Sequence, residues 1–226
     1  MRVADHLLLH AAGTRDGDPM KSAGNVVYLV DDDPRVREGL KNLFDSVEIA
    51  MLTFGSAADY LEHLRVDDGA CLILDLQMPG IGGLELQSRL SQEGSPPIIF
   101  ITGRGDITST VKAMKAGAIE FLTKPVDTEA LLGAVSTAFV RDRLLRDRRA
   151  VLSELENRYA SLSPREREVL PLVVKGLLNK QAAAVLGIKE VTLQIHRSQI
   201  MQKMAARSLA DLVRMAGRLS IPKDGR

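Results

Sequence analysis

The amino-acid sequence predicts an α/β domain with a parallel sheet, followed by a smaller all-α domain that contains a helix-turn-helix. Between about Asn25 and Val140, short apolar runs alternate five times with longer amphipathic stretches, as strands and helices do in βα units. Only helical patterns follow, and the charge changes sign. Residues 1–140 hold 12 Lys and Arg against 20 Asp and Glu, a net of −8, whereas residues 141–226 hold 18 against 9, a net of +9. The basic half therefore fits a partner rich in phosphates, and the acidic half could hold a cation.

The five strands of the first domain are expected to run parallel, because the stretches between them are long enough for helical crossovers. The first, third and fourth apolar runs are nearly continuous, which is typical of strands covered on both faces. The expected strands are Val26–Val30, Glu48–Phe54, Cys71–Leu74, Ile98–Ile101 and Ala118–Leu122. The expected helices are Pro34–Ser46, Ser56–Leu64, Gly83–Gln92, Ile107–Ala116 and one that starts near Asp127. Pro34 suits a first helical turn, and Ser56 and Asp127 suit N-caps.

The helix that starts near Asp127 contains no proline as far as about Tyr159 and is expected to include a linker at residues 141–160. A seven-residue spacing fits either a solvated linker helix or a coiled-coil seam between two chains. The residues with this spacing are Ala138, Leu145, Leu152 and Tyr159. The coiled coil would make this helix a dimer contact.

The last part of the chain, residues 161–226, is predicted to be the helix-turn-helix domain, with the α/β domain at 25–140. Ser163-Pro164-Arg165-Glu166 has the N-cap, proline and acid of a helix start, and Gly176 ends that helix. Lys180–Leu186, a turn at Gly187 and Glu190–Ala205 form the expected helix-turn-helix, and a last helix covers Ser208–Leu219.

Composition excludes several classes of protein. The single cysteine, Cys71, excludes an intramolecular disulfide framework and a thiolate zinc cluster, which favours a cytoplasmic location. No apolar run approaches the ~20 residues of a membrane span, so no membrane partner is expected. Residues 1–24 lack periodicity and are predicted to form a disordered tail, in which Leu7–Leu9 is too short for a secretory signal.

Polar residues stand where the apolar runs of the predicted sheet stop. Asp31-Asp32-Asp33 follows the first strand, Asp75 the third and Thr102 the fourth, and Lys124 lies two residues beyond the fifth. Ligands of open parallel sheets bind outside the carboxyl ends of the strands. Carboxylates gathered there need a cation, and Mg²⁺ accepts a few carboxylates while it keeps several waters. We therefore expect a Mg²⁺ site at this edge of the sheet.

A lysine and a hydroxyl beside such a site would serve phosphoryl oxygens. We expect Asp75 to be the nucleophile that accepts a phosphoryl group, Lys124 to pair with that group, and Thr102 to donate a hydrogen bond to it. The expected metal ligands are Asp32 directly, Asp31 through water, Asp75, and the backbone carbonyl of Gln77. Each residue taken alone also has an ordinary structural interpretation, such as a helix cap or a solvated charge.

Four segments resemble the receiver domain of two-component response regulators over about Asn25–Val140: Val30–Asp33, Leu74–Gly80, Ile101–Gly103 and Thr123–Pro125. The resemblance implies a flavodoxin-like (βα)₅ fold with strand order 2-1-3-4-5 and phosphorylation of Asp75 by a sensor histidine kinase. It also implies a cis peptide before Pro125. The aromatic switch residue of the family falls on Phe121, which lacks the tyrosine hydroxyl of many members. Coupling at Phe121 would therefore depend on packing and on Thr102, and a plain core aromatic is the alternative.

Segments of the basic half resemble the four-helix, LuxR-type helix-turn-helix of the NarL/FixJ class: Leu162–Leu170, Gly176–Gln181 and Val191–Met204. The packed side of its second helix is expected to hold Val191, Ile200 and Met204, with either Ile195 or Leu193. The groove-facing candidates are Gln194, Arg197, Ser198 and again Ile195. Phosphate contacts are expected from Lys180, Lys189, Thr192, His196 and Lys203. Lys189 stands where the family usually has a Ser N-cap, and Leu178 stands where it usually has Ser or Thr.

These features predict a DNA-binding response regulator rather than an enzyme. A sensor histidine kinase would phosphorylate Asp75 and so control dimerisation and binding to double-stranded promoter DNA, with RNA polymerase as a further partner. A homodimer of the phosphorylated chain suits an inverted-repeat operator. The receiver could assist its own phosphorylation and dephosphorylation. Two alternatives stay open at this point: a Mg²⁺-dependent phosphohydrolase with an aspartyl nucleophile, and a helix-turn-helix regulator that works without phosphorylation.

Overall fold

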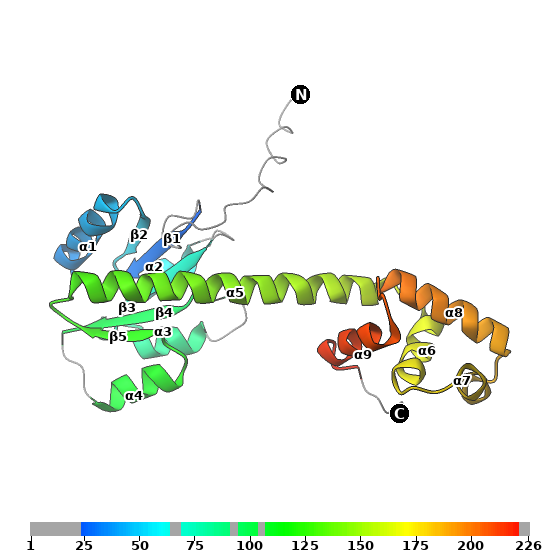
Figure 1. The fold of residues 1–226 in the computed structure, drawn as a ribbon. Coiled ribbons are helices and arrows are strands. Elements are labelled where there is room, and N and C mark those ends of the chain that lie inside the picture. The colour runs from blue at the N-terminus through cyan, green and yellow to red at the C-terminus, as the bar shows by residue number, and fades with distance from the viewer. Residues whose placement is uncertain (1–23, 64–68, 91–94, 104–106, 222–226) are drawn as a thin grey trace, which may run out of the picture. The chain divides into compact units, whose positions relative to one another are not determined.

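The computed structural model describes residues 24–63, 69–90, 95–103 and 107–221. The described chain forms two compact units that divide between Leu145 and Arg146 (Figure 1). The predicted tail at residues 1–24 lies outside the described residues except for Gly24, and so do the last five residues of the predicted helix-turn-helix domain. None of the helices in the described part of the chain carries an apolar stretch of the length that a bilayer crossing needs.

The first unit alternates strands and helices, as the sequence predicts. Its elements are β1 (Val26–Val30), α1 (Pro34–Ser46), β2 (Ala50–Phe54), α2 (Ala57–Glu62), β3 (Ala70–Asp75), α3 (Gly83–Arg89), β4 (Ile98–Thr102), α4 (Ile107–Lys115), β5 (Glu120–Thr123) and the start of α5 (Thr128–Ala160). The strands pair in parallel in the order β2-β1-β3-β4-β5. This order is the one that the receiver resemblance implies, and it places β1 and β3 side by side at the centre of the sheet.

Alternate residues of the strands build two apolar cores, one on each face of the sheet. Val27, Leu29, Ile73 and Ile99 face the core formed with α1 and α5, whose members are Phe44 on α1 and Leu131, Val135, Ala138 and Phe139 on α5. Tyr28, Leu72, Leu74 and Phe100 face the core formed with α2, α3 and α4. Because both faces are covered, the central strands contain almost no exposed residue, which explains their continuous apolar runs.

Several element ends differ from the predictions for local reasons. β2 begins at Ala50 and not at Glu48, because Glu48 has a φ of +60° and its N–H bonds to the Asp45 carbonyl in a turn. β5 begins at Glu120, since the Ala118 N–H still bonds to the Ala113 carbonyl at the end of α4. Ser56 caps α2 as predicted, and Asp127 Oδ1 accepts the Ala130 N–H at the start of α5. Asp33 caps α1, and the Lys124–Pro125 peptide is cis.

Helix α5 is anchored along much of its length. Ala138, a member of the seven-residue spacing, is fully buried in the first unit, so this position serves the core there and is not free for a seam. Asp142 is also buried, and its Oδ2 accepts a hydrogen bond of 3.1 Å from the Ala70 N–H at the start of β3. Leu155 belongs to the core of the second unit. The predicted linker at residues 141–160 is therefore the continuation of a packed helix.

The second unit contains the end of α5 and four further helices: α6 (Pro164–Val174), α7 (Asn179–Leu186), α8 (Glu190–Lys203) and α9 (Leu209–Arg218). Gly187 has a φ of +64° at the end of α7, so the chain turns there at little steric cost and starts α8 three residues later, at Glu190. The helix-turn-helix is thus α7, this turn and α8, as the sequence predicts. Leu193 and Ile200 of α8 and Leu212 of α9 lie in one core.

Glu166 joins the start of α6 to the end of α8. Its carboxylate accepts the Ser163 N–H at 2.7 Å in the predicted capping box, and Lys203 Nζ lies 2.7 and 3.0 Å from its two oxygens. Burial alone would raise the pKa of Glu166, but the hydrogen bonds from Lys203 and Ser163 outweigh burial and lower this pKa below its ordinary value of 4.5. The stabilisation that Glu166 gives is therefore present above pH 4.5 and lost as the pH falls through the lowered pKa.

The substitution Glu166→Gln should lower the free energy of opening of α6 and α8 by about 1–2 kcal/mol, because a charged hydrogen-bond acceptor is lost while the amide can still cap Ser163. Hydrogen exchange of the α6 and α8 amides, followed by mass spectrometry at pH 7 and pH 4, measures this loss, which should shrink at pH 4. Glu168→Gln is the matched control, since Glu168 is exposed and pairs only with Arg165 in the described contacts. Equal effects of the two substitutions would contradict the role of Glu166.

Candidate functional site

Two aspartates at the carboxyl ends of adjacent strands form the centre of the site. Asp31 follows β1 and is fully buried, and Asp75 ends β3 with 5% of its surface exposed. Asp32 is exposed beside them. One carboxylate oxygen from each of the three residues lies within 4.8 Å of the others. The sequence prediction that strand ends would bring these carboxylates together is therefore confirmed in the geometry.

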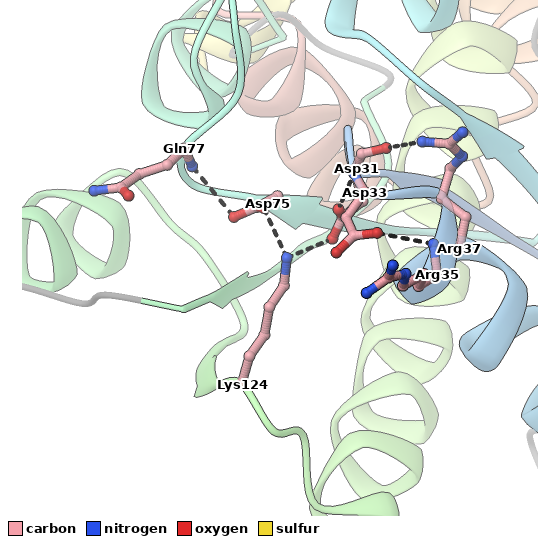
Figure 2. Close-up of polar contacts among 7 residues, drawn as sticks. All are labelled: Asp31, Asp33, Arg35, Arg37, Asp75, Gln77 and Lys124. Carbon is pink, nitrogen blue, oxygen red and sulfur yellow. Dashed lines mark hydrogen bonds and ion pairs between the residues drawn. The ribbon is translucent and has the colours of Figure 1, made fainter.

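Lys124 lies between the two buried carboxylates. Its Nζ is 2.7 Å from Oδ2 of Asp31 and 2.7 Å from Oδ2 of Asp75 (Figure 2). Burial raises the pKa of Asp31, and the hydrogen bonds from Lys124 and the Asp33 N–H offset only part of this effect. Burial alone would lower the pKa of Lys124, but the two aspartates outweigh it and raise the pKa of the ammonium group. Lys124 therefore stays charged at neutral pH and offsets part of the negative charge of the carboxylates.

Backbone and side-chain contacts orient the two carboxylates. The Asp33 N–H donates to Asp31 Oδ1 at 2.9 Å, and the Gln77 N–H donates to Asp75 Oδ1 at 3.2 Å. Arg37 on α1 donates to the Asp31 carbonyl at 2.7 Å, so the loop after β1 is tied to the helix that follows it (Figure 2). The sequence analysis did not identify Arg37, because an arginine on a helix has the same place in the sequence pattern whether it faces solvent or binds a backbone carbonyl.

The remaining predicted residues of the site lie on β4 and β5. Thr102 ends β4 and is fully buried, and the Lys124 N–H donates to the Thr102 carbonyl at 2.8 Å. Phe121 on β5 is half-buried, with its ring centroid 6.2 Å from that of Phe100. Phe121 therefore lies at the surface of the core on the α2–α3–α4 face. This placement agrees with both interpretations of Phe121, the switch residue and the core aromatic.

Gly83 allows α3 to start directly against the end of β3. A Cβ atom on Gly83 would lie 2.4 Å from the Asp75 carbonyl oxygen and 3.0 Å from Phe100. Because backbone atoms of Asp75 would have to move to admit it, only glycine fits here without a shift of the reactive strand end. The sequence analysis placed a helix start at Gly83 without recognising this steric reason.

The second unit presents most of the predicted DNA-binding residues to solvent. The exposed ones are Lys180 on α7, Lys189 just before α8, and five residues of α8: Thr192, Gln194, Ile195, Ser198 and Lys203. Lys189 stands at the N-cap of α8 and makes no side-chain cap, as expected from the sequence. At α7, Gln181 Oε1 accepts the Leu178 N–H at 3.0 Å, which is the half of a capping box that needs no polar side chain at position 178.

Two of the predicted DNA-binding residues also make structural contacts, and a third, His196, is partly buried. Arg197 donates to Asn179 Oδ1 at 3.0 Å and so links α8 to α7. Lys203 pairs with Glu166. His196 is half-buried, and its Nδ1 is buried without a hydrogen-bond partner among the described residues. For Arg197 and Lys203, the predicted base or phosphate contacts would come in addition to these contacts within the protein.

The predicted packed side of α8 is wrong at one position. Leu193, Ile200 and Met204 are fully buried, whereas Val191 is 68% exposed. Ile195 is 53% exposed, so of the two alternatives it is Leu193 that packs on the core and Ile195 that faces outwards. At about 100° per residue, positions 191, 193 and 195 cannot share one face of a helix.

Comparisons with known proteins agree with this geometry in both units. Residues 27–136 match the response regulator receiver domain, and residues 160–216 match the luxR family of bacterial regulatory proteins. Nodulation protein W of Bradyrhizobium diazoefficiens is 46% identical over 206 residues, which cover 91% of each chain. The chain belongs to the response regulators of the FixJ and NodW type.

Further relatives of this response regulator include TodT of Pseudomonas putida, which is 44% identical over 201 residues and 88% of each chain. FixJ of B. diazoefficiens is 37% identical over 199 residues, covering 88% of this chain and 97% of that one. The low-resolution structure of the response regulator StyR matches 87% of this chain and 100% of its own with a TM-score of 0.75 and 48% identity. The crystal structure of full-length FixJ from B. japonicum matches 89% of this chain and 99% of its own, with a TM-score of 0.51 and 36% identity.

The family assigns coarse roles to the two units of the response regulator. The receiver domain implies a cognate histidine kinase, and the luxR-family domain implies binding to DNA. Receiver domains bind Mg²⁺ at an acidic cluster, and here Asp31, Asp32 and Asp75 form such a cluster. Response regulators with a DNA-binding output domain are typically not enzymes, in agreement with the expectation from the sequence.

The substitution Gly83→Ala should lower the free energy of unfolding of the receiver by about 1–3 kcal/mol, because the added methyl overpacks the Asp75 backbone. Urea denaturation of the full-length response regulator measures this loss. Gly39→Ala on α1 is the matched control, since its Cβ would meet nothing within 4 Å, and it should instead stabilise the receiver by about 0.5–1 kcal/mol. A Gly83→Ala variant as stable as the wild type would disprove the close approach at Asp75.

Proposed function

We propose that Asp75 is the residue that carries the phosphoryl group and that a sensor histidine kinase supplies it. The observation that supports this most strongly is the position of Lys124, whose Nζ is 2.7 Å from both buried aspartates. A lysine held in this way can move from a carboxylate to a phosphoryl oxygen without leaving the site. Asp75 retains some exposure and Asp31 retains none, which favours Asp75 as the acceptor.

The transfer itself requires little covalent chemistry from the receiver. An oxygen of the Asp75 carboxylate attacks the phosphorus of the kinase phosphohistidine, the P–N bond breaks, and the imidazole nitrogen keeps the electron pair. Lys124 then balances the charge of the new acyl phosphate, and the buried Thr102 hydroxyl donates to one of its oxygens. Because positioning and charge suffice, the receiver would also assist its own phosphorylation by small donors and its dephosphorylation.

We propose that Asp31, Asp32, Asp75 and the backbone carbonyl of Gln77 hold Mg²⁺. The donor set supports this, because it consists of hard oxygen atoms and includes three carboxylates whose oxygens lie within 4.8 Å of one another. The bound ion would neutralise charge on the phosphoryl oxygens. In this arrangement Asp32 contributes from the exposed side, and the fully buried Asp31 contributes through water.

Packing inside the receiver would carry the change at Asp75 towards the DNA-binding domain. We propose that residues 25–140 are the receiver, 141–160 the linker helix and 161–226 the DNA-binding domain, and that Thr102 and Phe121 report the state of Asp75. The phosphorylated chain would form a homodimer in the cytoplasm that binds an inverted repeat in promoter DNA and acts on RNA polymerase. The proposed DNA contacts are Lys180, Lys189, Thr192, Gln194, Ile195, His196, Arg197, Ser198 and Lys203.

Acetyl phosphate with Mg²⁺ should add one phosphoryl group to the wild-type chain and none to Asp75→Asn, as intact-mass spectrometry would show. Asp45→Asn, at an exposed position of α1, is the matched control and should be labelled like the wild type. Phosphorylation should also tighten binding to promoter DNA, and Asp75→Asn should lose that change. Steady turnover of an added phosphomonoester would favour the phosphohydrolase, and equal DNA affinity in every case would favour the regulator that works without phosphorylation.

Removal of the Lys124 charge should tighten Mg²⁺ binding about tenfold, because a cation within hydrogen-bond distance of two ligands opposes the metal. Isothermal titration of the Lys124→Met chain with MgCl₂ measures the change. Lys124→Arg keeps the charge and should bind Mg²⁺ like the wild type, as should Lys115→Met, which removes an exposed lysine of α4. If Lys124→Met left the affinity unaltered, the metal would have to bind away from Asp31 and Asp75.

A further inference from the structure

The outer face of α8 carries two apolar side chains that have no place in the core. Val191 is 68% exposed and Ile195 is 53% exposed, although the same helix buries Leu193 completely. Val191 and Ile195 are four residues apart, so their side chains are neighbours on one face of the helix. Leu193 lies two residues from each, at about 200° around the helix axis, so this face is opposite to the core.

The surroundings of this pair are polar. Gln194 and Ser198 lie beside it on α8 and are exposed, and the domain as a whole is basic. Single exposed apolar residues are common on protein surfaces. An adjacent pair on the second helix of a helix-turn-helix is different, because the first turns of this helix are the part that enters the major groove.

Among the groups that the base pairs present in the major groove, the C5-methyl of thymine is apolar, whereas the others are hydrogen-bond donors and acceptors. An apolar side chain gains from contact with this methyl and leaves a polar group unsatisfied when it meets any other base edge. Aliphatic side chains at two successive turns can contact methyl groups on nearby base pairs. The exposed pair therefore favours double-stranded DNA with thymine over a protein surface, which would not explain the polar residues that flank it.

We propose that Val191 and Ile195 determine specificity by contacting thymine methyl groups in the operator of this response regulator. This inference rests on the proposed DNA-binding function and adds Val191 to the proposed contacts. Gln194 and Ser198 supply hydrogen bonds to neighbouring base edges, and the pair selects thymine at its own positions.

Selection from a random duplex library with the full-length chain, treated with acetyl phosphate and Mg²⁺, gives the preferred sequence. Each thymine of that sequence is then replaced by deoxyuridine, which removes only the methyl group. We expect deoxyuridine at the contacted positions of each half-site to weaken wild-type binding about fourfold, the effect of one methyl that is no longer buried. Val191→Ala and Ile195→Ala should each lose this penalty at one position and keep it at the other.

Val185→Ala is the matched control, because Val185 is 64% exposed but lies on α7. It should keep every deoxyuridine penalty. If the chain selects a sequence but deoxyuridine has no effect, or has the same effect in both α8 variants as in the wild type, thymine reading by these residues is disproved. The second result would place the pair against another protein surface, such as a second copy of the chain. If no sequence is selected, the proposed DNA-binding function fails together with the inference.

Discussion

The receiver of this response regulator depends on one lysine that pairs with two buried carboxylates at once. Asp31 and Asp75 are placed side by side because β1 and β3 are neighbours at the centre of the sheet, and Lys124 reaches both from the far side of β4. Without this ammonium group, burial of two like charges would be strongly unfavourable. The hydrogen bond from the Lys124 N–H to the Thr102 carbonyl fixes the backbone from which the lysine extends. Because one ammonium group is shared between two carboxylates, a phosphoryl group added at Asp75 can change which oxygens Lys124 binds.

Sequence patterns were sufficient for the course of the chain and for the residues at the strand ends. Apolar runs and amphipathic stretches gave the order of elements, and polar residues at the ends of the runs gave Asp31, Asp75, Thr102 and Lys124. The same patterns could not give the contacts that support these residues. Arg37 on the Asp31 carbonyl, Asp142 on the Ala70 N–H and Lys203 on Glu166 join positions 6, 72 and 37 residues apart. Charged residues on helices usually face solvent, so sequence periodicity does not distinguish these anchors from ordinary surface charges.

The error at Val191 has a related physical origin. Val191, Leu193 and Ile195 alternate with polar residues at a period of two, which would suit one face of a strand, but the segment is helical. On a helix such residues fall on opposite sides, so at least one of them must face solvent. The core needs Leu193, because it is the member of the set that shares a face with Ile200 and Met204. Apolar character alone therefore does not identify the packed side of α8. The packed side is the face on which Leu193, Ile200 and Met204 lie together.

The two ends of α8 are stabilised unequally, and this asymmetry fits its task. At the C-terminal end, Lys203 pairs with Glu166, and Arg158 of α5 donates to the Met204 carbonyl at 3.4 Å. At the N-terminal end, the N-cap residue Lys189 offers no side-chain acceptor to the first N–H groups of the helix. These N–H groups and the lysine charge are suited to an anion, and DNA phosphates supply one at the groove edge. The protein therefore holds α8 at one end, and the proposed DNA contacts would complete the helix at the other end, where Val191 and Gln194 lie.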